Sequence, residues 1–398
     1  MPFLSSKLPD VGVSIFARMT ALAQQTGALN LAQGFPDYDP PLALREALAR
    51  HALAAGSHQY APMPGLPRLR AAISAQAARL QADAPAPDPD TEITITAGAT
   101  EGLYAVLAAV VRPGDEVLVL EPAYDLYGPA IRLQGGVPRY VRLAAPHFRP
   151  DWEAVRAALT PRTRLIMVNT PHNPSGAVFG AEDWQALAEL LAGTDVLLLS
   201  DEVYEHLVFD GAPPRSARQH PALRERAFVL SSFGKTYHAT GWKVGYCLAP
   251  PALSAELRRV HQFVTFSVST PTQSALADVL EADPTDAHAR GLAAFYQAKR
   301  DLFRQLLGGG DSGGGWELLP VPAGYFQLAD YRRLSAESDL AFATKMARDM
   351  GVAVVPLSAF YHDRYDGGLI RFCFAKEKAT LREAAQRLAV GKTSSQPT

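Results

Sequence analysis

Residues 231–246 read SSFGKTYHATGWKVGY and place one lysine, Lys235, after a glycine and a second, Lys243, eight positions later. The triplet Gly-Lys-Thr ends the nucleotide-binding P-loop, but that motif needs a glycine at position 229, where the chain has Val229. Without this glycine the backbone cannot close around a phosphate. A lysine that follows the predicted strand Ala227–Ser231 is suited instead to form a Schiff base with a carbonyl cofactor and to move protons. Such chemistry needs a pocket, and pockets of open α/β sheets lie at strand ends.

The composition favours a large enzyme without nucleic acid or membrane partners. The chain has 398 residues, 48% of them hydrophobic, and a formal net charge of −2. This length supports two lobes, and the balanced charge gives no reason to bind nucleic acid or an anionic membrane. The N-terminus lacks the apolar core of a signal peptide, and runs such as Val196–Leu199 are too short to span a bilayer. Cys247 and Cys373 lie far apart, which indicates a reduced, cytoplasmic enzyme whose thiols serve packing.

Strand-like and helix-period segments alternate over the first two thirds of the chain. Short runs of leucine and β-branched residues between helices are typical of parallel strands that are covered on both faces. The pattern predicts an α/β fold: a three-layer α/β/α large domain with a mostly parallel sheet. The predicted strands are Glu92–Thr96, Glu116–Leu120, Leu165–Asn169, Val196–Ser200 and Ala227–Ser231, and the predicted helices are Leu66–Leu80, Gly98–Val111 and Ala181–Leu191.

The remaining segments predict a second, smaller α+β domain. After a helix at Ala287–Leu307, the glycine-rich GGGDSGGG at 308–315 indicates a flexible loop. The chain then mixes short strands, at Tyr325–Leu328 and Leu369–Phe374, with helices. We therefore expect an N-terminal segment at 1–45 that joins the small domain, a large domain at 46–290, the small domain at 291–390 and a disordered tail at 391–398.

Two predicted strand ends carry candidates for an anion site and for a buried charge. Strand Glu92–Thr96 runs into the small residues Gly98, Ala99 and Thr100 at a helix start, where backbone N–H groups can hold a phosphate. An ordinary tight turn explains the same residues equally well. Asp201 ends an apolar strand, where a carboxylate needs a cation such as a protonated pyridine nitrogen. The alternative is that Asp201 caps a helix.

Two further strand ends carry an amide and an aromatic ring. Asn173 lies in NTPHNPSG, where it could point back across the strand ends, although Asn-Pro is common in turns generally. Tyr124, in EPAYDLY, could cover a cofactor ring or could be a packing residue. Each residue is weak evidence alone, but together they place a cofactor pocket around Lys235. No metal site is expected.

Six ordered motifs resemble the class I/II aminotransferases of fold type I, which depend on pyridoxal 5'-phosphate. The motifs are GATEGLY, EPAYDLY, NTPHNPSG, SDEVYEHLVF, SSFGKTYHATGWKVGY and IRFCFAKEK. The resemblance extends from LAQGFPDYDPP at 31–41 to about residue 388. The lysine segment is most similar to the branch of methionine aminotransferases and kynurenine–oxoglutarate (glutamine) transaminases.

The resemblance implies a role for each matching residue. Lys235 would form the internal aldimine with pyridoxal phosphate and shuttle the proton, and Asp201 would pair with the pyridinium nitrogen. Asn173 and Tyr204 would donate to the phenolate oxygen, and Tyr124 would stack on the ring. The phosphate ligands would be Gly98, Ala99, Thr100, Ser232 and Lys243, with Tyr60 of the neighbouring subunit in a homodimer. Arg371, Asn173 and the backbone of Gly34 would bind the substrate α-carboxylate.

The implied reaction moves the amino group of an apolar or aromatic amino acid, of the methionine, phenylalanine, kynurenine or glutamine type, to a 2-oxo acid. Dicarboxylate substrates are disfavoured because Val260–Gln273, the expected side-chain-selecting stretch, contains no arginine. It offers Phe263, Phe266 and Ser269 instead, although the phenylalanines could be plain core. A cysteine-conjugate β-lyase on the same scaffold is the nearest alternative. A non-enzymatic regulator is disfavoured because Lys235 and Asp201 are both present.

Overall fold

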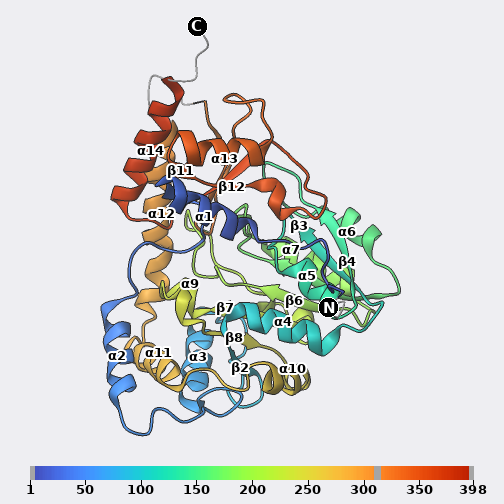
Figure 1. Cartoon of the computed structure of the whole chain (residues 1–398). Helices are drawn as coiled ribbons and strands as arrows, with labels where there is room; N and C mark the ends of the chain where they lie inside the picture. The colour runs from blue at the N-terminus through green and yellow to red at the C-terminus, as the bar shows by residue number, and fades with distance from the viewer. Residues whose placement is uncertain (1–4, 309–314, 394–398) are drawn as a thin grey trace.

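The computed structural model describes residues 5–308 and 315–393, and its centre is a sheet of seven strands (Figure 1). The strand order is β2-β8-β7-β6-β5-β3-β4, and only β8 runs antiparallel to its neighbours. The predicted mostly parallel α/β sheet is therefore confirmed. The strands are β2 (Ile93–Thr96), β3 (Glu116–Glu121), β4 (Val137–Arg142), β5 (Thr163–Asn169), β6 (Leu197–Asp201), β7 (Ala227–Ser232) and β8 (Gly245–Leu248).

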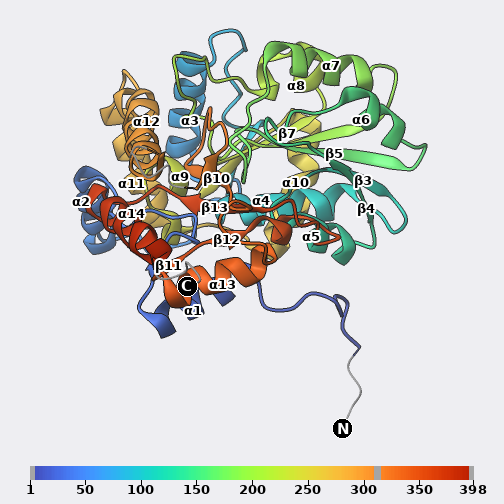
Figure 2. The same ribbon diagram turned by 90° about the horizontal axis from the view of Figure 1, so that it is seen from above.

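Two hydrophobic cores cover the two faces of this sheet, because successive side chains of a strand point to opposite sides. In β3, Val117 and Val119 belong to one core and Leu118 and Leu120 to the other. Figure 2 shows the two helical layers on either side of the sheet. One layer holds α4 (Gly98–Val110), α5 (Tyr127–Leu133) and α10 (Pro251–Val264), and the other holds α3 (Pro67–Leu80), α6 (Trp152–Ala158), α7 (Ala181–Leu191) and α8 (Pro221–Arg224).

A second, antiparallel sheet forms the smaller α+β part, with the strand order β12-β13-β10-β9. The N-terminal segment packs beside this sheet through β1, which pairs in parallel with β11 to form a separate two-stranded sheet. The strands are β1 (Leu29–Asn30), β9 (Glu317–Leu318), β10 (Phe326–Asp330), β11 (Val352–Ala353), β12 (Val355–Pro356) and β13 (Leu369–Cys373). Around them lie α1 (Ile15–Thr26), α13 (Asp339–Asp349) and α14 (Lys378–Thr393).

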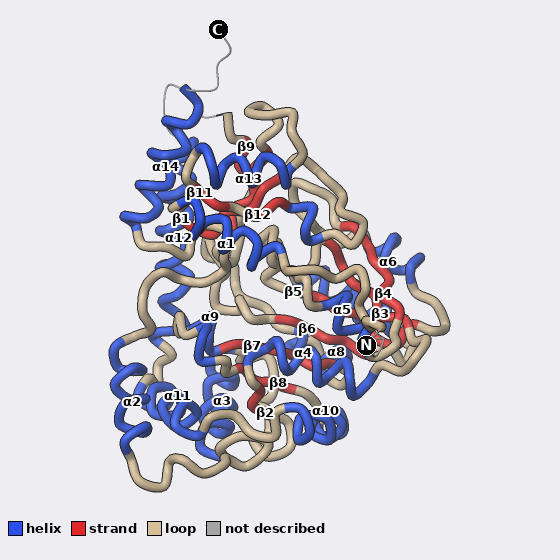
Figure 3. Tube along the Cα trace, in the orientation of Figure 1, coloured by secondary structure: helices blue, strands red, loops and turns tan. Residues whose placement is uncertain are grey.

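Long helices connect the two sheets, and loops fill much of the space between them (Figure 3). Helix α12 (Ala287–Gly308) contains the predicted domain boundary at 290/291, and α2 (Leu42–Leu53) contains the one at 45/46. Helix α11 (Thr270–Ala282) packs against α2 and α3. The domain limits therefore stay a prediction.

The C-terminal helix differs from expectation at its end. Helix α14 reaches Thr393 and so enters the predicted disordered tail at 391–398, because the chain carries no proline there before Pro397 to stop a helix. Residues 394–398, and residues 309–314 of the predicted flexible loop, lie outside the described residues. Within residues 5–308 and 315–393, no helix combines the length and apolar character needed to cross a bilayer.

Candidate active site

One cavity of about 330 Å³ brings together all of the predicted site residues except Tyr60. They come from both sheets and from the N-terminal segment, so the cavity lies where these parts of the chain meet. The members of the set are Gly34, Gly98, Ala99, Thr100, Tyr124, Asn173, Asp201, Tyr204, Ser232, Lys235, Lys243 and Arg371. In the described part of the chain, no group of three or more His, Cys, Asp or Glu side chains could hold a metal ion.

Lys235 lies in α9 (Phe233–Thr236), the short helix that follows β7. Its Nζ donates a hydrogen bond to the carbonyl oxygen of Gly34 at 3.1 Å, and the hydroxyl of Tyr325 donates to the same oxygen at 2.7 Å. Desolvation in the cavity lowers the pKa of Lys235 from 10.5 to about 8. A substantial fraction of this lysine is therefore a neutral amine near pH 8, as a nucleophile or a general base requires.

Asp201 ends β6 and is buried, with 6% of its surface exposed. The hydroxyl of Tyr127 donates to Asp201 Oδ2 at 2.6 Å, and the N–H of Val203 approaches Oδ1 at 3.4 Å. Asp201 caps no helix, because the next helical turn begins only at Ala217. Burial raises the pKa of Asp201, so the carboxylate needs a cation beside it. A protonated pyridine nitrogen meets that need.

The side chain of Lys243 lies against the start of α4, where an anion could bind. Gly98 adopts a positive φ of 72°, and a Cβ there would come within 3.2 Å of Lys243 Nζ. The ammonium lies 3.5 Å from the hydroxyl of Thr100 in the first turn of α4. A cation at the positive N-terminal end of a helix is unfavourable unless an anion lies between them. A phosphate between Lys243 and the helix start would satisfy both groups.

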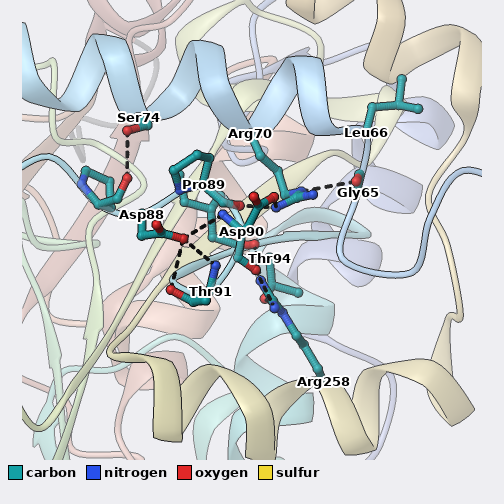
Figure 4. A network of polar contacts seen from close by, with 12 residues as sticks. Gly65, Leu66, Arg70, Ser74, Asp88, Pro89, Asp90, Thr91, Thr94 and Arg258 are labelled. Atoms are coloured by element: carbon teal, nitrogen blue, oxygen red, sulfur yellow. Dashed lines mark hydrogen bonds and ion pairs between the residues drawn. The ribbon is translucent and has the colours of Figure 1, made fainter.

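Two arginines fix the segment that leads into β2 and this anion site (Figure 4). Arg258 of α10 donates to the carbonyl oxygens of Asp90 and Ile93 at 2.8 and 2.7 Å. Arg70 of α3 donates to the carbonyl oxygens of Pro89 and of Gly65, the latter at 3.2 Å. Edge strand β2 therefore holds a fixed position although it has only one strand neighbour.

Arg371, on β13, is a buried cation with no ion-pair partner within residues 5–308 and 315–393. Its Nη1 donates to Asn173 Oδ1 at 2.7 Å and its Nη2 to the carbonyl oxygen of Ala32 at 2.8 Å, while Nε lacks a partner. The guanidinium lies 4.0 Å from the ring centroid of Phe326. Burial lowers the pKa of Arg371 from 12.5 to about 10. A substrate carboxylate would supply the missing negative charge.

The amide of Asn173 is held by its neighbours so that its nitrogen remains free to donate. Its Oδ1 accepts from Arg371, and its backbone N–H donates to Asn169 Oδ1 at 2.7 Å. Asn169 Nδ2 in turn donates to the carbonyl oxygen of Asp201 at 2.8 Å. The ring of Tyr204 packs edge-on against Tyr325, with 5.1 Å between the ring centroids. The loops after β5 and β6 are thus tied together.

Sequence reasoning missed several residues that complete the site. Tyr127, Asn169, His172, Tyr325 and Phe326 all contact predicted site residues or the loops that carry them. Tyr127, Asn169 and His172 lie within two of the motifs quoted above, but nothing in the sequence pattern separated them from their neighbours. His172 donates from Nε2 to the carbonyl oxygen of Pro122 at 2.8 Å and accepts at Nδ1 from Ser175 Oγ at 2.7 Å.

Tyr60 does not line the cavity and is 83% exposed. Its ring packs edge-on against Phe266, with 5.3 Å between centroids. Phe263 and Phe266 are 86% and 46% exposed among the described residues, so the alternative that they are plain core is wrong. Ser269 directly precedes α11.

Cys247 and Cys373 are both free and buried, in line with the predicted packing role.

The fold and the site together define an aminotransferase of fold type I. Residues 26–388 match the family model described as aminotransferase class I and II. The chain belongs to this family, whose members depend on pyridoxal phosphate, and it is an enzyme of the transaminase type.

Two relatives and one solved structure fall in the branch expected from the lysine segment. The chain is 51% identical to the methionine aminotransferase of Escherichia coli strain K12, over 96% of this chain and 97% of that one. It is 34% identical to the kynurenine–oxoglutarate transaminase of Dictyostelium discoideum, over 96% and 95% of the two chains. The crystal structure of YbdL from Escherichia coli, identified as having a methionine aminotransferase function, superposes with a TM-score of 0.93 at 50% identity and covers 98% of this chain and 100% of its own.

Proposed function

We propose that the protein is a homodimeric, cytoplasmic aminotransferase that uses pyridoxal 5'-phosphate to move the amino group of methionine or another apolar or aromatic amino acid to a 2-oxo acid. One observation carries the proposal: the cavity around Lys235 combines an anion site, a buried carboxylate and a second, unpaired buried cation. Relatives that act on methionine and kynurenine support the substrate class.

The residues of the cavity fit the cofactor at both of its charged ends. Lys243 and the N-terminus of α4 would hold the phosphate, because they otherwise face each other as like charges. Ser232 and Thr100 would add hydroxyl donors. Asp201 would hold the proton of the ring nitrogen, since its carboxylate is buried and lacks a cation partner in the described residues. Lys235 would be the covalent anchor.

The cofactor, when bound, supplies an electron sink for the negative charge that develops at the substrate Cα. The chain's own residues do the rest. Arg371 binds and orients the substrate carboxylate, which selects the bond to Cα that faces Lys235. Lys235 Nζ, whose pKa is lowered to about 8, takes the proton from Cα as a general base. Phe16 and Phe326 add apolar surface to the wall of the cavity.

The charges of the cavity favour an apolar substrate side chain. Three cationic residues line the cavity, and each has a proposed partner. Lys235 would bind the cofactor aldehyde, Lys243 the cofactor phosphate and Arg371 the substrate α-carboxylate. A second substrate carboxylate would therefore be buried without a counter-charge, which costs several kcal/mol, of the order of 2–5. Methionine and aromatic side chains carry no such cost.

A matrix of amino donors and 2-oxo acids tests the proposal. We expect methionine or an aromatic amino acid to give a higher kcat/KM than aspartate, and Lys235→Ala to abolish turnover. Lys345→Ala, which removes a partly exposed lysine of α13, should leave activity unchanged and serves as the control. Full activity of Lys235→Ala, or aspartate as the best donor, would overturn the proposal. Pyruvate and ammonia released from a cysteine conjugate without an oxo acid would indicate β-lyase chemistry instead.

A further inference from the structure

Asp201 has one close hydrogen-bond donor among the described residues, the phenol of Tyr127. Tyr127 Oη donates to Asp201 Oδ2 at 2.6 Å, a length typical of a charge-assisted bond between a hydroxyl and a carboxylate. The other contact, from Val203 N to Oδ1, is longer at 3.4 Å. Tyr127 and Asp201 are 3% and 6% exposed, so the bond between them is buried.

The ring of Tyr127 is held in place on several sides. Helix α5 starts at Tyr127, whose N–H donates to the carbonyl oxygen of Tyr124 at 3.1 Å. The ring of Tyr124 meets that of Tyr127 edge-on, with 5.8 Å between centroids. Tyr127 also belongs to the core under α4 and β3. The phenol therefore presents its hydroxyl to Asp201 in a fixed direction and links Asp201 to Tyr124, the proposed stacking residue.

Titratable groups face Asp201 from each neighbouring element: Tyr127 from α5, Lys235 from α9, and Tyr124 and Tyr204 from the loops after β3 and β6. Among these four titratable groups, only Tyr127 forms a hydrogen bond with the carboxylate of Asp201. Burial raises the pKa of Tyr127, so the phenol keeps its proton and acts as a donor. Its bond to Asp201 stabilises the ionised carboxylate against the desolvation that otherwise favours a neutral acid.

We propose that Tyr127 is a positioning residue that keeps Asp201 ionised and aimed at the ring nitrogen of the cofactor, and so keeps the shared proton on that nitrogen. This inference rests on the proposed function. Without the phenol, Asp201 gains proton affinity, and the proton moves from the ring nitrogen toward the carboxylate. A ring nitrogen that has lost its proton withdraws less charge from the substrate Cα, which slows the step in which Lys235 acts as base.

The test compares Tyr127→Phe with Tyr331→Phe. Both substitutions delete one buried hydroxyl that donates one hydrogen bond, since Tyr331 Oη donates to the carbonyl oxygen of Glu337 at 2.8 Å in the small lobe. Both should lower the unfolding midpoint by a similar amount. The decisive readout is the nitrogen-15 NMR signal of cofactor labelled at the ring nitrogen, measured at neutral pH. It should lie at the protonated position in the wild type and in Tyr331→Phe, and move toward the unprotonated position in Tyr127→Phe.

Steady-state kinetics provide a second readout that a merely structural role would not produce. In Tyr127→Phe we expect kcat to fall about ten-fold, because the variant loses one hydrogen bond to a charged group. KM should change less than about two-fold, because Arg371 and Gly34, which bind the substrate carboxylate, are unchanged. An unchanged ring-nitrogen signal, or kinetics equal to those of Tyr331→Phe, would overturn the inference for Tyr127 alone. Failure of the wild type to bind the labelled cofactor would overturn the proposed function as well.

Discussion

Arg371 and Asn173 are joined across the active-site cavity, with Arg371 Nη1 donating to Asn173 Oδ1 at 2.7 Å. The two residues are 198 positions apart and lie on β13 and on the loop after β5. The contact ties the proposed carboxylate-binding residue to the loop that also approaches the cofactor. A substrate carboxylate would therefore meet a guanidinium that has a neutral hydrogen-bond acceptor but no ion-pair partner among the described residues.

The variant Asn173→Asp should raise KM for the amino donor. Its carboxylate would lie against the guanidinium, neutralise it and repel the substrate carboxylate. A hydrogen bond to a charged group is worth about 1.5–3 kcal/mol, so KM should rise about ten- to a hundred-fold. Asn173→Ala removes the same amide donor but adds no charge, and should raise KM less. Equal rises in the two variants, measured as initial rates over a range of donor concentrations, would contradict the charge explanation.

The apoprotein should become more stable when Lys235 is replaced by methionine. The pKa of Lys235 is lowered from 10.5 to about 8, so below pH 8 the folded chain carries a buried charge at a cost on the order of 3 kcal/mol. Because the unfolded chain binds more protons between pH 8 and 10.5, this cost disappears as the pH rises through that window. Urea unfolding of cofactor-free protein should show Lys235→Met more stable than wild type at pH 7.

The difference in unfolding free energy between wild type and Lys235→Met should shrink as the pH rises from 8 to 10.5. Lys345→Met serves as the control because this side chain is 40% exposed and has only a distant ion pair with Glu337. It should change stability by less than about 0.5 kcal/mol at either pH. A Lys235→Met variant that is less stable than wild type at pH 7 would contradict a buried, destabilising charge.

His172 should make the fold sensitive to acid. Burial lowers the pKa of His172 to about 4, and both ring nitrogens already hold hydrogen bonds, to Pro122 and Ser175. Its folded pKa lies below the unfolded value of 6.5, so the unfolded chain binds more protons between pH 6.5 and 4. The free energy of unfolding therefore decreases as the pH falls from 6.5 to 4, and the total decrease is about 3 kcal/mol.

Replacing His172 with phenylalanine should remove that acid sensitivity and lower stability at pH 7. The loss at neutral pH should be about 1–3 kcal/mol, because the carbonyl oxygen of Pro122 and the hydroxyl of Ser175 lose a buried partner. Unfolding curves at pH 7 and 4.5 measure both effects. His220→Phe, at a surface contact with Gln185, should keep the wild-type acid slope. The same slope in His172→Phe as in wild type would show that His172 does not titrate in this window.

The sequence predicted the buried strands of the central sheet but not β4 or β8. Strand β4 lies at the edge and exposes alternate residues, so it has no continuous apolar run. Strand β8 is buried and apolar, but its four residues begin inside the lysine motif, which was interpreted as a site segment and not as a strand. The convergence of the predicted site residues on one cavity could be predicted because they follow strand ends, which converge in parallel sheets. The role of Tyr127 could not be predicted, because its partner Asp201 lies 74 positions away in the sequence. A buried tyrosine at the start of a helix is also indistinguishable from a packing residue.

The aromatic surface around Tyr60 supports a site that two subunits share. Tyr60 and Phe263 are 83% and 86% exposed, and Tyr60 packs only against Phe266 among the ring contacts of the described residues. Exposed aromatic rings of this size are costly in water and typical of surfaces that another molecule covers. We expect the covering molecule to be a second copy of the chain. The family resemblance implies that Tyr60 binds the cofactor phosphate, but Tyr60 does not line the cavity of the chain it belongs to.

Mixed dimers should show whether Tyr60 serves the neighbouring site. A phenol that donates to the cofactor phosphate contributes about 1.5–3 kcal/mol, so Tyr60→Phe should weaken cofactor affinity about ten- to a hundred-fold. When Tyr60→Phe chains are mixed with Lys235→Ala chains, the site that keeps Lys235 receives Tyr60 from the other chain. That site should recover wild-type cofactor affinity and activity, measured by equilibrium dialysis and initial rates after subunit exchange is verified. If exchange is complete and no recovery follows, or if an isolated monomer is fully active, Tyr60 does not belong to the active site.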